Sequence, residues 1–195
     1  MHNSESDCER ICLPIVIPSS LTSDGRVPST RPVRDWLSRR TIVRMSDDLS
    51  PTERTRELLA LAYREANRFN HDWVGVEHVL LAITRQPGTI AALALESLGI
   101  TLNDIRAQIE DVLAAGEKTQ IGTIILAPRM HEVLRLAREQ ARSRGHRHMG
   151  TEHVLLGILT EGHSQAARKL VGTGVSREVV EARLDDLLFE HGREL

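Results

Sequence analysis

Aromatic residues and cysteines are scarce in this chain of 195 residues. Phe, Trp and Tyr make up 3% of the chain, although hydrophobic residues make up 41%. The core must therefore be built from aliphatic side chains such as Leu and Ala, which favours helices. The only cysteines, Cys8 and Cys12, cannot form a disulfide framework and lack further ligands at metal-binding spacing. A reducing, cytoplasmic setting is expected.

Long apolar runs and a strong net charge are also absent. No run of about 18 apolar residues occurs, so no membrane span is predicted. The formal net charge is −2, so the chain has no overall basic field for nucleic acid or an anionic membrane. Gly116-Glu117-Lys118-Thr119 superficially resembles the end of a phosphate loop, but the upstream Gly is missing and a predicted helix precedes it. We therefore expect no ATP, no cofactor, no metal and no catalytic residues.

The chain does contain a tandem duplication with an offset of 75 residues. The stretch Gly75-Val76-Glu77-His78-Val79-Leu80-Leu81 recurs as Gly150-Thr151-Glu152-His153-Val154-Leu155-Leu156. The two copies align without a gap from about Leu49 to Leu188. Two similar units are predicted, and each is too small to be more than marginally stable alone, so they should pack into one body.

Helical periodicity and capping signals predict an all-α fold of eight helices and no sheet, arranged as two pseudo-twofold four-helix units. The first helix is predicted to start with Ser50 as N-cap and Pro51 at the first helical position. Thr151 is predicted to cap the second helix of the second repeat. Eight leucines are expected in the core: Leu61, Leu80, Leu81, Leu95, Leu136, Leu155, Leu156 and Leu170.

The predicted domain organisation follows the repeat. Residues 1–48 carry four prolines and several serines without a helical period, and we expect a mostly disordered extension. An alternative is that translation starts at Met45. The double domain is expected at 49–190, with repeat 1 at 49–115, a linker at 116–126 and repeat 2 at 127–190.

Paired histidines and arginines offer two alternative kinds of site. His71 and His78 recur as His146 and His153. No Cys or His-Glu-x-x-His pattern accompanies them, so a structural bond from a ring nitrogen to backbone near a helix start is favoured over a metal site. Separately, the face from Arg135 to Arg142 could bind nucleic acid or another protein. Glutamates share that helix and no aromatic side chain interleaves, which favours a solvated face.

Glu77 and Glu152 lie in the first turns of matching predicted helices. A carboxylate there stabilises the helix dipole by about 0.3 to 1 kcal/mol. It could instead accept a guanidinium group in a planar, two-pronged pair, which suits recognition of arginine-bearing ligands. Both interpretations remain open from the residues alone.

These motifs resemble the duplicated Clp N-terminal domain, most closely the ClpC type, over roughly residues 49 to 190. Leu95-Glu96-Ser97-Leu98-Gly99-Ile100 and Ala127-Pro128-Arg129 also match its pattern. The chain ends at Leu195 without an ATPase module, so a free-standing domain is expected. The resemblance implies a monomeric, non-enzymatic module. It would bind Clp unfoldase or protease components, adaptors or degradation-marked proteins, or act as a decoy.

In ClpC-type relatives the Glu of each Gly-Thr-Glu-His motif recognises phosphorylated arginine. The resemblance therefore implies ligand-binding roles for Glu77 and Glu152, each with the residue before it. Thr151 is retained in the second repeat, whereas Val76 replaces Thr in the first. We expect the second pocket to be the stronger one, because Val76 lacks the hydroxyl that would hydrogen-bond a phosphate.

Overall fold

The protein is described by a computed structural model that covers residues 49–114, 116 and 124–192. The predicted extension 1–48, Met45 and most of the linker lie outside this part of the chain. Eight helices occur within it: α2 (Glu53–Arg68), α3 (Val76–Thr84), α4 (Ile90–Ser97), α5 (Leu102–Val112), α6 (Pro128–Ser143), α7 (Thr151–Glu161), α8 (Gln165–Gly172) and α9 (Arg177–Gly192). Helices α2–α5 come from the first repeat and α6–α9 from the second.

Hydroxyl side chains fix the start of several helices. Thr52, Thr89, Thr101 and Ser164 each accept a hydrogen bond from the backbone N–H three residues later. Each bond satisfies one of the four N–H groups that a helix leaves unpaired at its start. The predicted cap at Ser50 is wrong by two residues, because Ser50 and Thr52 bond through their backbone to Met149. Thr151 is likewise the first residue of α7, and Gly150 is its N-cap.

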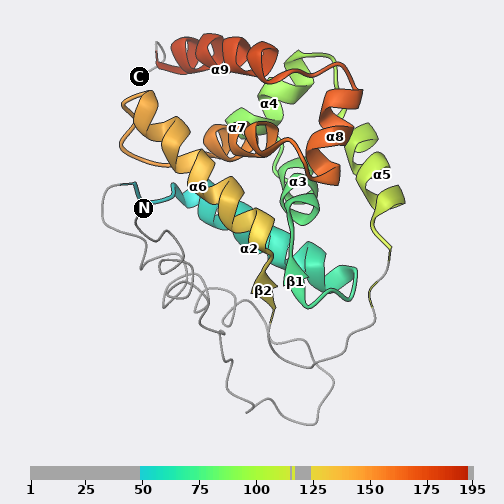
Figure 1. Ribbon diagram of the computed structural model, residues 1–195. Helices are drawn as coiled ribbons and strands as arrows, with labels where there is room; N and C mark the ends of the chain where they lie inside the picture. Colours follow the sequence, from blue (N-terminus) through green and yellow to red (C-terminus); the bar gives the residue numbers. More distant parts are fainter. Residues whose placement is uncertain (1–48, 115, 117–123, 193–195) are drawn as a thin grey trace, which may run out of the picture.

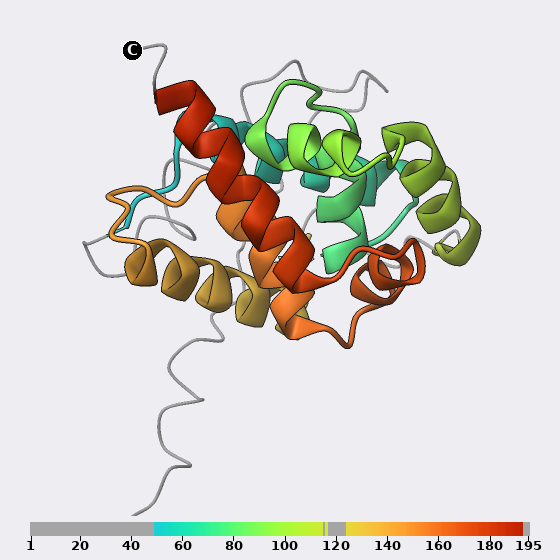
Figure 2. The ribbon, with the colours of Figure 1, turned by 90° about the horizontal axis from the view of Figure 1, so that it is seen from above.

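The two repeats interlock as a pseudo-twofold pair. Within each repeat the first helix packs on the second, α2 on α3 and α6 on α7. Between repeats, α4 packs against α9, and α5 packs against α8. The third helix of each repeat thus lies on the fourth helix of the other. Figure 1 shows α9 across one end of the molecule, and Figure 2 shows it lying in front of α7. Neither repeat completes its core alone.

A short parallel sheet corrects the prediction that the fold has none. Strand β1 (Trp73–Val74) pairs with β2 (Ile125–Leu126), as Ile125 N–H donates to Asp72 and Ala127 N–H donates to Val74. The pseudo-symmetric place holds a single bridge between Pro51 and Met149. The pairing of β1 with β2 gives backbone groups of these two connections hydrogen-bond partners.

The core is aliphatic, as the composition predicts. Six of the eight expected leucines are buried, among them Leu81 and Leu156 with no exposed surface. Leu61 and Leu136 are only partly buried. Buried residues of α6 lie at Met130, Val133, Leu134, Ala137 and Ala141. Position 136 falls at the edge of that stripe, because successive residues of a helix turn by about 100°. Within the described residues, no helix is long and apolar enough to cross a membrane.

Candidate functional site

Each repeat places its Gly-x-Glu-His motif at the start of its second helix, opposite the start of a helix from the other repeat. We call these places site 1 and site 2. Site 1 consists of Val76 and Glu77 at the start of α3 with the N-terminus of α8. Site 2 consists of Thr151 and Glu152 at the start of α7 with the N-terminus of α4. The interlocked helices therefore bring together residues about 60 to 90 positions apart in sequence.

The glycine before each motif lies in close contact with a side chain of its own repeat. A β-carbon at position 75 would collide with the Trp73 indole, and one at position 150 would collide with the Glu152 carboxylate. Both collisions are closer than real β-carbons come to other atoms. Glycine therefore lets the chain enter the helix directly beneath these side chains.

In site 2 the Thr151 hydroxyl faces α4. Its Oγ1 accepts a hydrogen bond from the Ala91 N–H at 3.5 Å. Glu152 folds back over the start of its own helix, where 13% of its side chain remains exposed. Burial raises the pKa of the Glu152 carboxyl, partly offset by its own backbone N–H and by the positive charge near His146 and Arg144. A buried carboxylate of this kind gains from the approach of a cation.

In site 1 the carboxylate takes the place of the hydroxyl. Glu77 Oε1 accepts the N–H groups of Gln165 and Ala166, at 3.1 Å and 3.4 Å. Val76, which matches Thr151, is buried and has no side-chain acceptor. The two sites are therefore equivalent in position and different in hydrogen bonding.

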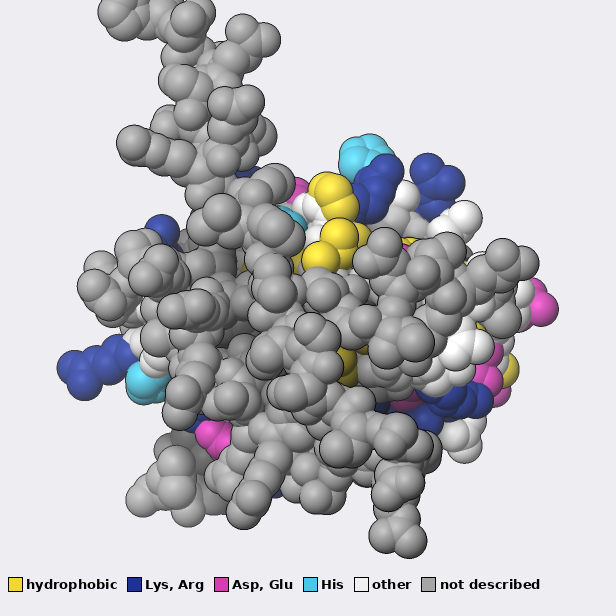
Figure 3. Space-filling model, turned by 90° about the horizontal axis from the view of Figure 1, so that it is seen from below, with side chains coloured by type: hydrophobic (Ala, Val, Ile, Leu, Met, Phe, Trp, Pro, Cys, Tyr) yellow, Lys and Arg dark blue, Asp and Glu magenta, His cyan; other side chains and the backbone are white. Residues whose placement is uncertain are grey.

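A groove of about 950 Å³ lies beside site 1. Its walls combine apolar side chains such as Trp73, Val112 and Ile125 with four Arg or His side chains: His71, Arg129, His163 and Arg168. Within this groove the Ile125 side chain is 48% exposed. Figure 3 shows a face on which hydrophobic side chains lie beside Lys or Arg and His side chains. A mixed surface of this kind suits a peptide better than a small polar ligand.

The four paired histidines form two hydrogen-bonded chains. His78 Nδ1 accepts the Gly75 N–H at 2.9 Å, so its Nε2 carries the proton and donates to His71 Nδ1 at 2.8 Å. His71 Nε2–H then donates to the Ala114 carbonyl at 2.9 Å. The second repeat repeats the first two bonds, from Gly150 to His153 and from His153 to His146, at 2.9 Å and 2.8 Å. The predicted bond from a ring nitrogen to backbone at the helix start is confirmed.

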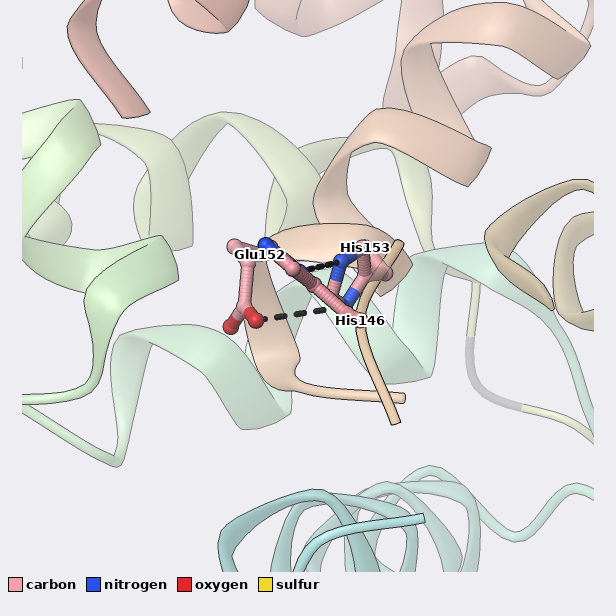
Figure 4. A group of neighbouring side chains, drawn as sticks. All are labelled: His146, Glu152 and His153. Atoms are coloured by element: carbon pink, nitrogen blue, oxygen red, sulfur yellow. Dashed lines mark hydrogen bonds and ion pairs between the residues drawn. The ribbon is translucent and has the colours of Figure 1, made fainter. Parts of the chain in front are cut away.

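One cluster in the second repeat has the composition of a metal site. Ligand-type atoms of His146, Glu152 and His153 lie within 4.8 Å of one another (Figure 4). His153 Nδ1 lies 3.1 Å from Glu152 but already accepts the Gly150 N–H. Burial lowers the pKa of His153 to about 4, so the pair is not ionic near neutral pH. A metal ion here would have to displace the histidine chain, and we assign it no metal-binding role.

On the arginine face of α6, Arg135 and Arg138 are already engaged by neighbouring groups, whereas Arg142 is exposed. Arg135 pairs with both Glu132 and Glu139 on its own helix. Arg138 is partly buried and donates to the Leu134 carbonyl. Phosphate binding would have to compete with these contacts, so the geometry does not favour nucleic-acid binding at this face.

Comparison with known proteins identifies the domain. Residues 50–173 match the Clp repeat (R) N-terminal domain. The chain belongs to this family. It is 42% identical over 125 residues to the negative regulator of genetic competence ClpC/MecB of Bacillus subtilis (strain 168), which covers 64% of this chain and 15% of that protein. The matched region is thus a small part of the relative, and it is the non-catalytic N-domain.

Solved structures show the same Clp N-domain fold. The N-domain of ClpV from Vibrio cholerae superposes with a TM-score of 0.62 at 18% identity, covering 70% of this chain and 86% of that one. A complex of the ClpV N-domain with a VipB peptide gives a TM-score of 0.59 at 19% identity, covering 70% and 88%. Clp N-domains are substrate- and adaptor-binding modules of Clp chaperones.

Proposed function

We propose that this chain captures degradation-marked proteins or adaptors for a Clp unfoldase, and that site 2 holds a phosphorylated arginine as the mark. The module would act without catalysis, as a recruiter or as a decoy for the unfoldase's own N-domain. The observation that carries the proposal is that the Thr151 hydroxyl bonds to the start of α4, while the neighbouring Glu152 carboxylate lies largely buried at the start of α7.

Phosphoarginine has two parts that these groups complement. The guanidinium is a planar cation, and Glu152 can accept it through two parallel hydrogen bonds once its carboxylate turns out from its own helix. The phosphate is an anion, which suits the start of α4 because the positive end of the helix dipole lies there. The Thr151 hydroxyl supplies one more donor. A ligand without the guanidinium group could not pair with Glu152. A ligand without the phosphate could not use the start of α4 or the Thr151 hydroxyl.

The electrostatics of Glu152 add a pH dependence. Burial raises the pKa of its carboxyl in the free protein, and a bound guanidinium would lower that pKa again. Ligand binding would therefore release a proton when the carboxyl is protonated. Affinity is expected to fall as the pH drops from neutral through the raised pKa of Glu152.

Titration calorimetry with free phosphoarginine tests the proposal. Glu152→Gln keeps the shape of the side chain but removes its charge, and it should weaken binding about tenfold or more, since a hydrogen bond to a charged group is worth about 1.5 to 3 kcal/mol. Glu77→Gln in site 1 is the matched control and should leave this binding almost unchanged. Equal effects of the two changes would contradict the assignment to site 2.

A pull-down from cell lysate addresses the partners. The wild-type chain is expected to capture Clp components or phosphoarginine-bearing proteins. Glu152→Gln should lose the marked proteins while keeping any partner that docks elsewhere. The solved complex of a ClpV N-domain with a VipB peptide supports peptide binding as a property of this fold, and the groove beside site 1 offers such a surface. Capture that is identical for both forms would argue against recognition of the mark.

A further inference from the structure

The two sites present the same backbone amide to different acceptors. Ala91 and Ala166 are equivalent positions in the repeat, because 91 + 75 = 166, and each is the second residue of its helix. Ala91 N–H donates to the Thr151 hydroxyl oxygen. Ala166 N–H donates to the Glu77 carboxylate, which also accepts the Gln165 N–H. A neutral acceptor thus faces α4 and an anion faces α8.

The difference has a local cause at position 76. Thr151 and position 76 are equivalent, because 151 − 75 = 76, and Val76 has no side-chain acceptor. Val76 is 1% exposed, so water does not replace the missing hydroxyl at its side chain. The start of α8 is only partly buried, and its N–H groups gain from an acceptor that the protein supplies. Glu77, the next residue, reaches the amide instead.

This contact occupies both halves of a potential phosphoarginine site. The carboxylate of Glu77 lies where a phosphate would meet the N-terminus of α8, and like charges repel there. The same carboxylate is engaged with two N–H groups, at 3.1 Å and 3.4 Å, and would have to leave them to accept a guanidinium. In site 2, the hydrogen bond to α4 comes from Thr151 and leaves Glu152 uncommitted to that helix.

We propose that Val76 closes site 1 to phosphorylated arginine by leaving Glu77 as the internal acceptor of the α8 N-terminus, so that position 76 sets whether this domain has one mark-binding site or two. The inference rests on the proposed function of site 2. Val76 then determines the specificity of site 1, and the Glu77 carboxylate occupies the place that the ligand's phosphate would take. The groove beside site 1 keeps its apolar surface for an unmodified peptide segment.

Basic residues lie around site 1, and they should attract a phosphate if Glu77 no longer occupies the N-terminus of α8. Arg129 and Arg168 line the same groove as Glu77, and Arg168 corresponds to Leu93 in the first repeat. Arg129 also pairs with Glu161 at 2.7 Å. Once Glu77 is released, this site should be at least as attractive to a phosphate as site 2. The contact of Glu77 with the N-terminus of α8 is therefore the feature that prevents phosphoarginine from binding at site 1.

Exchanging the two residues is the direct experiment. Calorimetry with free phosphoarginine should give one site for the wild-type chain and two for Val76→Thr. Thr151→Val should weaken the wild-type site about tenfold or more. The double exchange should again give one site, now abolished by adding Glu77→Ala. Two sites of equal affinity in the wild type, or a Val76→Thr variant that binds no more equivalents than the wild type, would overturn the proposal.

A spectroscopic measurement tests the contact without any ligand. In ¹H–¹⁵N spectra of the full chain, Glu77→Gln should shift the amide resonances of Gln165 and Ala166. The same change in a Val76→Thr background should shift Ala166 much less, because the new hydroxyl then serves it. Glu152→Gln is the matched control and should leave Ala91 in place. Equal shifts of Ala166 in both backgrounds would overturn the role of Val76.

The two measurements separate the two proposals. If no variant binds phosphoarginine while the spectra behave as expected, the proposed function fails and the internal contact stands. If the wild type binds none and Val76→Thr binds one equivalent, site 2 is not a mark site but the closure of site 1 is supported. If the wild type binds one equivalent and Val76→Thr adds none, the closure fails and site 2 stands.

Discussion

Acid is expected to destabilise this domain through two buried histidines, His78 and His153. Burial is the main cause that lowers the pKa of each imidazole from 6.5 to about 4, and the neighbouring histidine adds to it. Each ring accepts a backbone N–H at Nδ1 and donates from Nε2 to the next ring. A proton added to Nδ1 would face the N–H of Gly75 or Gly150, so protonation breaks the bond at the helix start.

The sign follows from the lowered pKa. The folded form binds the proton more weakly than the unfolded chain, so the stabilisation is complete above about pH 6.5 and is lost as the pH falls through about 4. A pKa difference of about 2.5 is worth about 3 kcal/mol for each histidine. Domains are stable by only about 5 to 15 kcal/mol in total. The raised pKa of Glu152 acts in the opposite direction and offsets part of the loss in the second repeat.

Urea unfolding followed by circular dichroism, from about pH 7.5 to about pH 4.5, measures this dependence. His78→Gln and His153→Gln should be less stable than wild type at neutral pH, yet lose less stability on acidification. The exposed His163 provides the control, since His163→Gln should follow the wild-type slope. If all four proteins lose stability in parallel, the buried histidines do not control the acid response.

Three further changes test the packing, each by urea unfolding. Leu81→Ala should lower the free energy of unfolding by about 2 to 5 kcal/mol, whereas Val171→Ala, at a position 55% exposed, should lower it by less than about 0.5 kcal/mol; similar losses would contradict the core assignment. Gly157→Ala places a β-carbon 2.6 Å from the Val133 carbonyl oxygen and should lower stability by about 1 to 3 kcal/mol; a neutral result would show that α6 and α7 can move apart. Glu65→Gln should lower stability by about 2 kcal/mol, because the buried carboxylate pairs with three partly exposed arginines, and added salt should not remove the difference.

Much of the fold could be predicted because it depends on local chemistry and on repetition. Apolar residues at helical spacing predicted the number of helices and their order, and eight helices occur in the described residues. Because the two repeats are offset by 75 residues, each helix predicted in the first repeat was also predicted 75 residues later in the second. The histidine at the third position of α3 and α7 was predicted to bond to backbone near the helix start for the same reason, and the structure confirms it.

The misassigned features depend on contacts between distant residues. Ser50 fails as a cap because its backbone pairs with Met149, and the short sheet forms because β1 and β2 meet only in the folded chain. The local sequence does not predict the pairing of Ser50 with Met149. It does not predict the pairing of β1 with β2 either, because each strand has only two residues. Leu136 was expected in the core because it is apolar, whereas its exposure depends on how α6 is rotated against α7.

The sequence by itself determined that two equivalent sites exist, because duplication copied Glu77 to Glu152. It also determined that they differ at one hydroxyl, Thr151 against Val76. Only the tertiary structure decided the consequence of that difference, since Glu77 reaches amides 88 and 89 residues away. The physical reason is that a helix start must find acceptors for its N–H groups, and the interlocking of the repeats decides which side chain is near enough to supply them.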